Sequence, residues 1–324
     1  MSRSRDQLNE DYTRLQSLME GNGPLGPGSA TIHDRNAVVE PVKPGQRIYT
    51  PEREALHREI ILEIVNEARS RGVPKDRKVI LMAGVPASGK TTIRDSRILG
   101  ESPMLIIDTD DVKRRLVSKL EARRELPDIP EFGPDERHLQ LSGKLQRVHS
   151  EASDVVTKVI AEARMQGLNM VVDDTMRDKD KTVRRIAGLR RDKYQVEACY
   201  VCAPIEQAQE QARTRCIDAW LNHDPRGATV IPTEVWAEAL RHADGVIDNA
   251  RIFVELVHAG AANGGFDRGA FVDCTGGRRL GRDGLPGVVG VTWEAGIRRD
   301  HDLVAARHLD QMIPPHLRSL DLQR

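Results

Sequence analysis

Short apolar runs alternate with longer amphipathic stretches along most of this chain. The apolar runs predict strands at residues 79–83, 104–107, 170–172, 196–202, 252–256 and 270–272. The amphipathic stretches predict helices at residues 50–72, 112–120, 136–167, 179–190, 204–221 and 233–244. Strands that alternate with helices in this way indicate an α/β fold, with a parallel sheet covered by helices on both faces.

The pattern changes at both ends of the chain. Residues 6–20 have a weak helical pattern, the glycines and prolines of residues 21–28 break regular structure, and irregular sequence follows as far as Arg47. Thr50 is the expected N-cap of the first core helix. We therefore expect an N-terminal helical arm and linker at residues 1–49, a core at residues 50–275, and a C-terminal extension with a terminal helix at residues 276–324.

The segment after the first predicted core strand fits the pattern G-x-x-x-x-G-K-[ST]. In this pattern backbone N–H groups surround the β-phosphate, the lysine reaches the β- and γ-phosphates, and the hydroxyl group ligates Mg²⁺. A glycine-rich turn with an incidental lysine is the alternative, but it explains neither the apolar run before the segment nor the helix-compatible residues after it. The residues expected to bind the nucleotide are Gly84, Val85, Pro86, Ala87, Ser88, Gly89, Lys90, Thr91 and Thr92, called the phosphate loop below.

Acidic residues follow the second predicted core strand. Asp108, Asp110 and Asp111 come directly after it, and ligands of open α/β sheets bind at the carboxyl ends of strands. One of these acids could serve as base for a substrate hydroxyl and another could support the metal, and Asp108 and Asp110 share a face if the strand continues that far. The alternative is that Asp110 caps the next helix, with Asp111 in its first turn.

A second polar cluster follows the strand at residues 170–172. Asp173 could hold a metal through water, and Arg177 could neutralise charge on a transferring phosphoryl group. The alternative is a capping cluster for the following helix, because Asp174, Thr175 and Asp178 are all cap-forming residue types. The two interpretations are compatible.

Three further segments carry candidate site residues. Arg213 and Arg215 on a predicted helix, followed by Arg226 in a loop, suit a lid that closes on a triphosphate, although a surface helix also contains arginines. The irregular residues 126–135 could cover an acceptor substrate. Glu151 is either an exposed helix charge or a substrate ligand, and the residues alone favour exposure.

Composition restricts the classes of partner. Lys+Arg and Asp+Glu both number 49, so no bulk charge attracts nucleic acid or membrane, and an aromatic content of 3% provides few platforms for stacking bases. Nucleic acid is therefore an unlikely partner. The four cysteines are interpreted as buried thiols, including Cys199 and Cys202, which share a strand-like run. Without a signal peptide or a membrane-length apolar stretch, we expect a cytoplasmic protein.

Four segments together resemble the zeta toxin family of bacterial P-loop kinases. They are Gly84-Val-Pro-Ala-Ser-Gly-Lys-Thr91, Ile107-Asp108-Thr-Asp110, Ser150-Glu151-Ala152 and Val172-Asp173-Asp174-Thr175-Met176-Arg177. Their order and spacing match over about Val79 to Val272. The phosphate loop alone is unspecific, whereas the acidic segments at these separations are much more selective.

The resemblance implies a P-loop NTPase-type fold and transfer of a phosphoryl group from ATP, with Mg²⁺, to a hydroxyl of a UDP-N-acetyl amino sugar. Matched residue by residue, it implies that Lys90 and Thr91 bind ATP and Mg²⁺, Asp173 lies near the metal, and Asp110 is the catalytic base. It further implies that Glu151 and Thr175 bind substrate, Arg177 clamps phosphate or substrate, and Arg215 belongs to the lid, whereas Arg226 is displaced from the family position of the second lid arginine.

The family also resembles small kinases that phosphorylate nucleotides, polynucleotide ends or antibiotics, so other acceptors stay open. A nucleotide-dependent regulatory binding protein without an acceptor is the hypothesis from another class. Members of the family usually have an antitoxin partner that blocks the nucleotide site. The N-terminal arm is interpreted first as a frayed terminus, and alternatively as a helix that docks over the nucleotide site and restrains activity in cis.

Overall fold

The computed structural model describes residues 3–43, 46–95, 102–239, 248–273 and 291–294, and the chain forms two compact units. Unit 1 consists of Met1–Gly72, Ile107–Ala163 and Glu210–Val235. Unit 2 consists of Val73–Ile106, Arg164–Gln209 and Trp236–Arg324. Each unit is described by itself.

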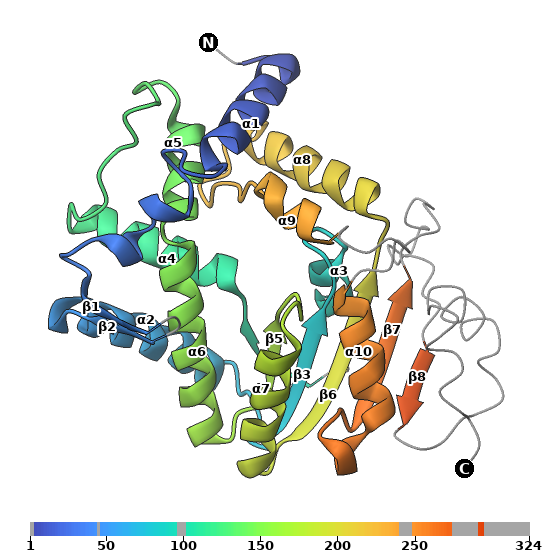
Figure 1. The fold of residues 1–324 in the computed structure, drawn as a ribbon. Coiled ribbons are helices and arrows are strands. Elements are labelled where there is room, and N and C mark those ends of the chain that lie inside the picture. Colours follow the sequence, from blue (N-terminus) through green and yellow to red (C-terminus); the bar gives the residue numbers. More distant parts are fainter. Residues whose placement is uncertain (1–2, 44–45, 96–101, 240–247, 274–290, 295–324) are drawn as a thin grey trace. The chain divides into compact units, whose positions relative to one another are not determined.

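A six-stranded sheet has the strand order β4-β5-β3-β6-β7-β8 (Figure 1). Strands β5, β3, β6 and β7 pair in parallel, and β8 runs antiparallel to β7. The strand bounds are β3 Lys78–Ala83, β4 Leu105–Ile107, β5 Met170–Asp173, β6 Gln195–Cys202, β7 Arg268–Asp273 and β8 Val291–Glu294. The five runs that become β3 to β7 were all predicted as strands, whereas β8 was not.

Helices cover both faces of this sheet. Because side chains alternate between the faces of a strand, Ile80 and Met82 of β3 share one face, where they pack with Ile93 of α3 (Lys90–Asp95). On the opposite face, the ring of Tyr200 lies 5.5 Å from that of Phe253 in α10 (Asp248–Ala259). Figure 1 shows α7 (Lys179–Arg191) on the same side of the sheet as α10. The predicted P-loop NTPase-type parallel sheet is therefore confirmed.

Most of the remaining elements belong to unit 1, η3 belongs to unit 2, and α6, α8 and α9 contain residues of both units. They are α1 Arg5–Met19, η1 Pro27–Ser29, η2 Thr31–His33, β1 Val38–Lys43, β2 Gln46–Tyr49, α2 Pro51–Ser70, α4 Thr109–Ala122, α5 Arg137–Arg147, α6 His149–Gln166, α8 Ile205–Leu221, α9 Thr233–Ala239 and η3 Ala261–Asn263. Helix α2 begins as predicted, because the Thr50 hydroxyl accepts a hydrogen bond from the Arg53 N–H at 3.3 Å. Residues 126–135 form no helix or strand, also as predicted.

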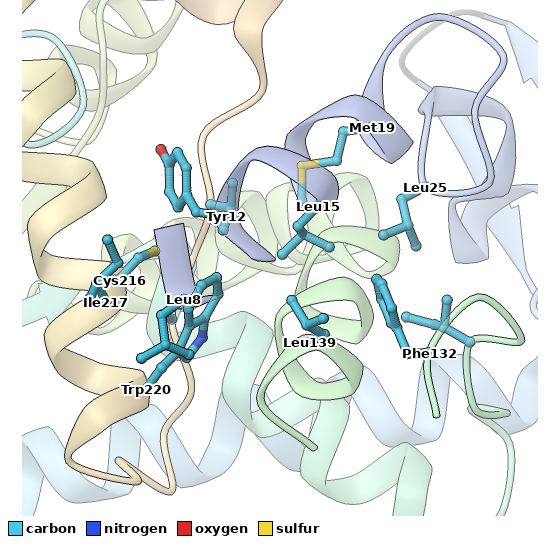
Figure 2. Close-up of a cluster of buried hydrophobic side chains, with 13 residues drawn as sticks. Leu8, Tyr12, Leu15, Met19, Leu25, Phe132, Leu139, Cys216, Ile217 and Trp220 are labelled. Atoms are coloured by element: carbon cyan, nitrogen blue, oxygen red, sulfur yellow. The ribbon is translucent and has the colours of Figure 1, made fainter. Parts of the chain in front are cut away.

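Helix α1 is part of a hydrophobic core and not a frayed terminus (Figure 2). A capping box between Ser4 and Gln7 starts the helix. Polar contacts also hold α1, because the Asn9 side chain accepts a hydrogen bond from Arg213 at 2.8 Å and Asp11 lies 2.9 Å from His138. The α1 cluster of buried side chains consists of Leu8, Tyr12, Leu15, Met19, Leu25, Ile129, Phe132, Leu139, Cys216, Ile217, Trp220, Ala228 and Val230.

Three predictions of local structure are wrong. The linker contains an antiparallel hairpin, β1–β2, in which Val38 pairs with Tyr49 and Glu40 with Ile48. The helix predicted at residues 136–167 is two helices, since Val148 leaves helical geometry with φ −86° and ψ 0° while its side chain stays buried. Residues 252–256 lie in α10 and not in a strand, because Ile252 and Leu256 are four residues apart on one helical face.

Some predictions fall on residues outside the described ranges. The helix predicted at residues 233–244 is described as α9 only to Ala239. The terminal helix at residues 302–312 and Cys274 also lie outside.

Candidate active site

The phosphate loop joins β3 to α3 in unit 2. Two of its glycines adopt positive φ, +135° at Gly84 and +98° at Gly89, which L-residues with side chains adopt rarely. A Cβ atom at Gly84 would lie 2.3 Å from the backbone oxygen of Val201, so β6 leaves no room for a side chain there. Ala87 also has a positive φ, +58°, although it is not glycine. These positions give the loop the curvature that turns successive N–H groups toward one point.

Lys90 and Asp173, from α3 and β5, lie close together in the structure. The Lys90 ammonium donates hydrogen bonds to the backbone oxygens of Gly84 at 3.1 Å and Val85 at 3.0 Å, and it lies 3.8 Å from Asp173 Oδ1. The pairing of β3 with β5 explains the approach, because it sets Met82 opposite Asp173. A lysine and an acid thus meet at the carboxyl edge of the sheet.

The residues of this loop fit a bound triphosphate and cation. The Ser88 hydroxyl is buried and has no hydrogen-bond partner among the described residues, so it remains able to bind a ligand atom. Mg²⁺ usually keeps several waters and takes one or two protein oxygens together with phosphate oxygens. Thr91 and Asp173 are the residues that would hold it. Within the described ranges, no group of three or more His, Cys, Asp or Glu side chains could hold a metal ion.

The polar segment after β5 contains the cap of α7 as well as residues predicted for the active site. Asp178 alone caps α7, accepting the Lys181 N–H at 2.8 Å. Asp174 accepts the N–H groups of Thr175 and Met176 and pairs with Arg185. Burial would raise the pKa of Asp174, but Arg185 and the backbone donors hold it below its ordinary value. Of the three residues in the predicted capping cluster, Asp178 caps α7, whereas Asp174 and Thr175 do not.

Arg177 and Thr175 lie in unit 2 with the phosphate loop. The Arg177 side chain is exposed, and Thr175 is fixed through its backbone oxygen, which accepts a hydrogen bond from Asn249 at 2.9 Å. Their proposed roles toward substrate stay predictions.

In unit 1, Asp108 and not Asp110 is the N-cap of α4. The Asp108 carboxylate accepts the Asp110 N–H at 2.8 Å, so the predicted alternative of capping by Asp110 is wrong. Strand β4 ends at Ile107, so the two acids do not share a strand face either. Asp110 lies in the first helical turn, and its Oδ1 accepts a hydrogen bond from Lys113 at 2.9 Å.

Three cations surround the Asp110 carboxylate. Burial alone would raise the pKa of Asp110, but the charges of Lys113, Arg114 and Arg215 hold it well below its ordinary value. Arg215 of α8 therefore lies within electrostatic range of Asp110 of α4, and these charges favour the ionised carboxylate. The neighbouring Cys216 is buried against this site, and burial raises the pKa of its thiol to about 12.

Glu151 is fully buried, which makes the expectation of an exposed charge wrong. Its carboxylate accepts a hydrogen bond from the Thr31 hydroxyl at 2.6 Å and lies 2.7 Å from His57 Nε2, with Arg53 at 3.5 Å. The Lys158 ammonium lies 3.2 Å from Nδ1 of the same imidazole, so Nδ1 is the acceptor and Nε2–H donates to Glu151. These partners come from the N-terminal segment and α2, and no local motif announces them.

The three arginines predicted to form a lid have different partners in the structure. Arg226 is largely exposed and pairs with Asp224, whose carboxylate lies 2.7 Å from Nη2. Its backbone oxygen accepts a hydrogen bond from Arg114 at 3.3 Å, so its loop adjoins the first turns of α4. Arg213 binds α1. Arg215 is close enough to Asp110 for its charge to lower the pKa of that carboxyl.

Two expectations about the rest of the chain can be compared with the structure. In the part of the chain that the structure describes, Cys199, Cys202 and Cys216 are buried thiols that form no disulfide, as predicted. None of the helices described has the length and apolar character needed to cross a membrane.

Comparisons with known proteins identify the family of this chain and structures with a similar fold. The profile of the AAA domain matches residues 79–244, just over half of the chain. No curated protein matches the chain. Among solved structures, the PezAT chromosomal toxin-antitoxin system of the human pathogen Streptococcus pneumoniae is 20% identical, with a TM-score of 0.47 over 69% of this chain and 78% of that one.

The AvrRxo1-ORF1:AvrRxo1-ORF2 complex with sulphate ions is 18% identical, with a TM-score of 0.50 over 87% of this chain and 77% of that one. This likeness shows a shared fold. The match of the AAA-domain profile begins in β3 and contains the whole phosphate loop, α4 and α8. The chain therefore belongs to the AAA-domain family of P-loop proteins.

Proposed function

We propose that this protein is an ATP-dependent phosphotransferase that moves the γ-phosphoryl group of ATP to a hydroxyl group of an acceptor. The observation that carries the proposal is the folded phosphate loop, with the Lys90 ammonium 3.8 Å from Asp173. A phosphate loop serves hydrolysis as well as transfer. An ionised carboxylate with no capping duty, Asp110, supports transfer, because it can accept the proton of an acceptor hydroxyl.

In the proposed reaction the acceptor oxygen attacks the γ-phosphorus, the bond to the β,γ-bridging oxygen breaks, and ADP leaves. The hydroxyl proton passes to the Asp110 carboxylate. Lys90 binds the β- and γ-phosphates, while Arg177 and Arg215 neutralise the charge of the transferring group. When bound, Mg²⁺ neutralises phosphate charge, with Thr91 and Asp173 holding it. Arginines in such roles contribute about 10³- to 10⁵-fold in rate.

The acceptor we propose is a UDP-N-acetyl amino sugar, and the support is the resemblance of the four motifs. Asp108, Thr175, Glu151 and Arg226 are its proposed ligands. The proposed role of Glu151 requires a local rearrangement, because its carboxylate is already hydrogen-bonded to Thr31 and His57. Acceptor binding at Glu151 requires Thr31 to release its hydrogen bond. An antitoxin partner and a cytoplasmic location belong to the same proposal.

Asp110→Asn tests the proposal against a matched control, Asp111→Asn. Both residues lie in the first turn of α4, but Asp111 pairs with Arg115 on the helix surface. The protein is incubated with ATP, Mg²⁺ and a metabolite extract, ADP release is followed, and new phosphorylated masses are identified. We expect Asp110→Asn to bind ATP normally and to lose transfer, and Asp111→Asn to retain both.

Full transfer activity in Asp110→Asn would remove that residue from the mechanism. Slow ADP release without dependence on any acceptor, and without a phosphorylated product, would instead favour a nucleotide-dependent regulatory protein.

A further inference from the structure

The proposed base has a lysine partner that the sequence reading did not identify. Lys113 lies one turn after Asp110 on α4, and its Nζ donates a hydrogen bond to Asp110 Oδ1 at 2.9 Å. The geometry follows from the start of the helix. Because Asp108 supplies the cap, the Asp110 side chain is not drawn to the backbone and can meet the residue three positions later.

Burial makes this pair unlike the other ion pairs of α4. The Lys113 side chain is 3% exposed and that of Asp110 is 31% exposed. A buried ammonium is costly unless it is paired, and within the described ranges Asp110 is the side chain that pairs with Lys113. Lys119 on the same helix instead shares two glutamates at the surface, Glu59 and Glu63.

The pair leaves the two carboxylate oxygens in different states. Oδ1 is bound to Lys113, whereas Oδ2 receives no hydrogen bond from the described residues. A buried lysine has few alternative positions, so the bond also restricts rotation of the carboxylate. One oxygen is thereby fixed and the other remains able to accept a proton.

We propose that Lys113 is a positioning residue for Asp110, holding Oδ1 so that Oδ2 is the oxygen presented to the acceptor hydroxyl. The inference rests on the proposed function above. A displaced catalytic group commonly costs about 10² in rate. Losing Lys113 should therefore lower kcat by about that factor, with little effect on the binding of ATP.

The experiment compares Lys113→Met and Lys113→Arg with Lys119→Met, the same change on the surface of α4. Steady-state ADP release is measured with ATP, Mg²⁺ and UDP-N-acetylglucosamine, and ATP binding and thermal unfolding are measured separately. We expect Lys113→Met to lose kcat with an unchanged KM for ATP. Lys113→Arg should restore most of the loss because it keeps a donor and a charge, and Lys119→Met should retain wild-type kcat.

A second arm asks whether Lys113 acts through Asp110. In an Asp110→Asn background, Lys113→Met should not lower the residual rate of ADP release any further, because the two residues act as one unit. Equal losses in both backgrounds would overturn the inference, as would a Lys113→Met enzyme within threefold of wild type. A wild-type protein that releases no ADP in response to the acceptor contradicts the proposed function itself, and the inference with it.

Discussion

Leu15→Ala is the sharpest test of the finding that α1 belongs to the core of unit 1. Leu15 is fully buried in the α1 cluster, where Figure 2 shows it among Leu139 of α5 and Leu25 of the segment after α1. Replacing a buried leucine by alanine costs about 2.7–5.0 kcal/mol, depending on how far the site collapses. Because the neighbours of Leu15 belong to separate elements, collapse should be limited. We expect a loss of about 3 kcal/mol or more from the free energy of unfolding of unit 1.

Trp220 provides the assay, because it is buried in the same cluster and lies 6.4 Å from Tyr12, ring to ring. With Trp236 and Trp293 replaced by phenylalanine, its fluorescence reports the unfolding of unit 1 in urea. With an m-value of about 2 kcal/mol/M, the midpoint should fall by about 1.5 M. Glu10→Ala, on the exposed side of α1, is the control and should stay within about 0.5 kcal/mol of the parent.

Equal midpoints for Leu15→Ala and Glu10→Ala would refute the reasoning. They would mean that α1 contributes no more to the stability of unit 1 than a loosely attached segment does.

Two further predictions concern charges of unit 1. Glu151→Gln should cost about 3 kcal/mol near pH 7, because it leaves Thr31 and His57 imperfectly paired in the core. Its partners hold the pKa of Glu151 below the ordinary value, so its contribution is complete above the unfolded pKa of about 4.3 and is lost as pH falls through the lower folded pKa. Urea midpoints at several pH values should therefore converge in acid, and a constant gap would contradict this. Lys119→Met should cost about 1 kcal/mol at low salt and much less in 1 M NaCl, because Glu59 and Glu63 bind Lys119 near the surface. A cost independent of salt would show that packing and not charge is lost.

The sheet and the phosphate loop could be predicted because their signals are local. Buried parallel strands are continuous apolar runs, and β3, β5 and β6 are such runs. Because β6 leaves no room for a side chain at Gly84, the loop needs glycine at that position. The requirement determines the residue type, so it can be recognised in the sequence. The approach of Lys90 to Asp173 then follows from strand order, because the phosphate loop that carries Lys90 to the start of α3 follows β3, and Asp173 ends the neighbouring parallel strand β5.

The predictions that were wrong concern residues whose surroundings depend on the packing of the folded chain. Glu151 has the pattern of a helix charge, and only Thr31 and His57, more than ninety residues away, make it a core residue. Val148 interrupts a helix without any proline or glycine, because a buried position in the packed unit matters more there than helical propensity. Asp108 and Asp110 are the same residue type two positions apart, so the sequence alone does not decide which of them caps α4.

The packing of α1 also limits how the N-terminal arm could regulate the protein. A conformational switch needs a minor state within a few kcal/mol of the major one. Undocking α1 would expose Leu8, Tyr12, Leu15 and Met19, and each buried side chain of this size contributes about 1.5–3 kcal/mol. Their sum, about 6–12 kcal/mol before the chain entropy regained on release, is large beside the stability of a domain, so we expect undocking of α1 to destabilise unit 1.

We therefore expect removal of residues 1–47 to lower activity by destabilising unit 1, whether or not the arm has an inhibitory role. Point changes that leave the α1 cluster intact are the informative ones. Asn9→Ala, which removes only the hydrogen bond to Arg213, changes the hold of α1 on α8 without opening the core. Inhibition in cis, if the arm exerts it, has to act with α1 in place.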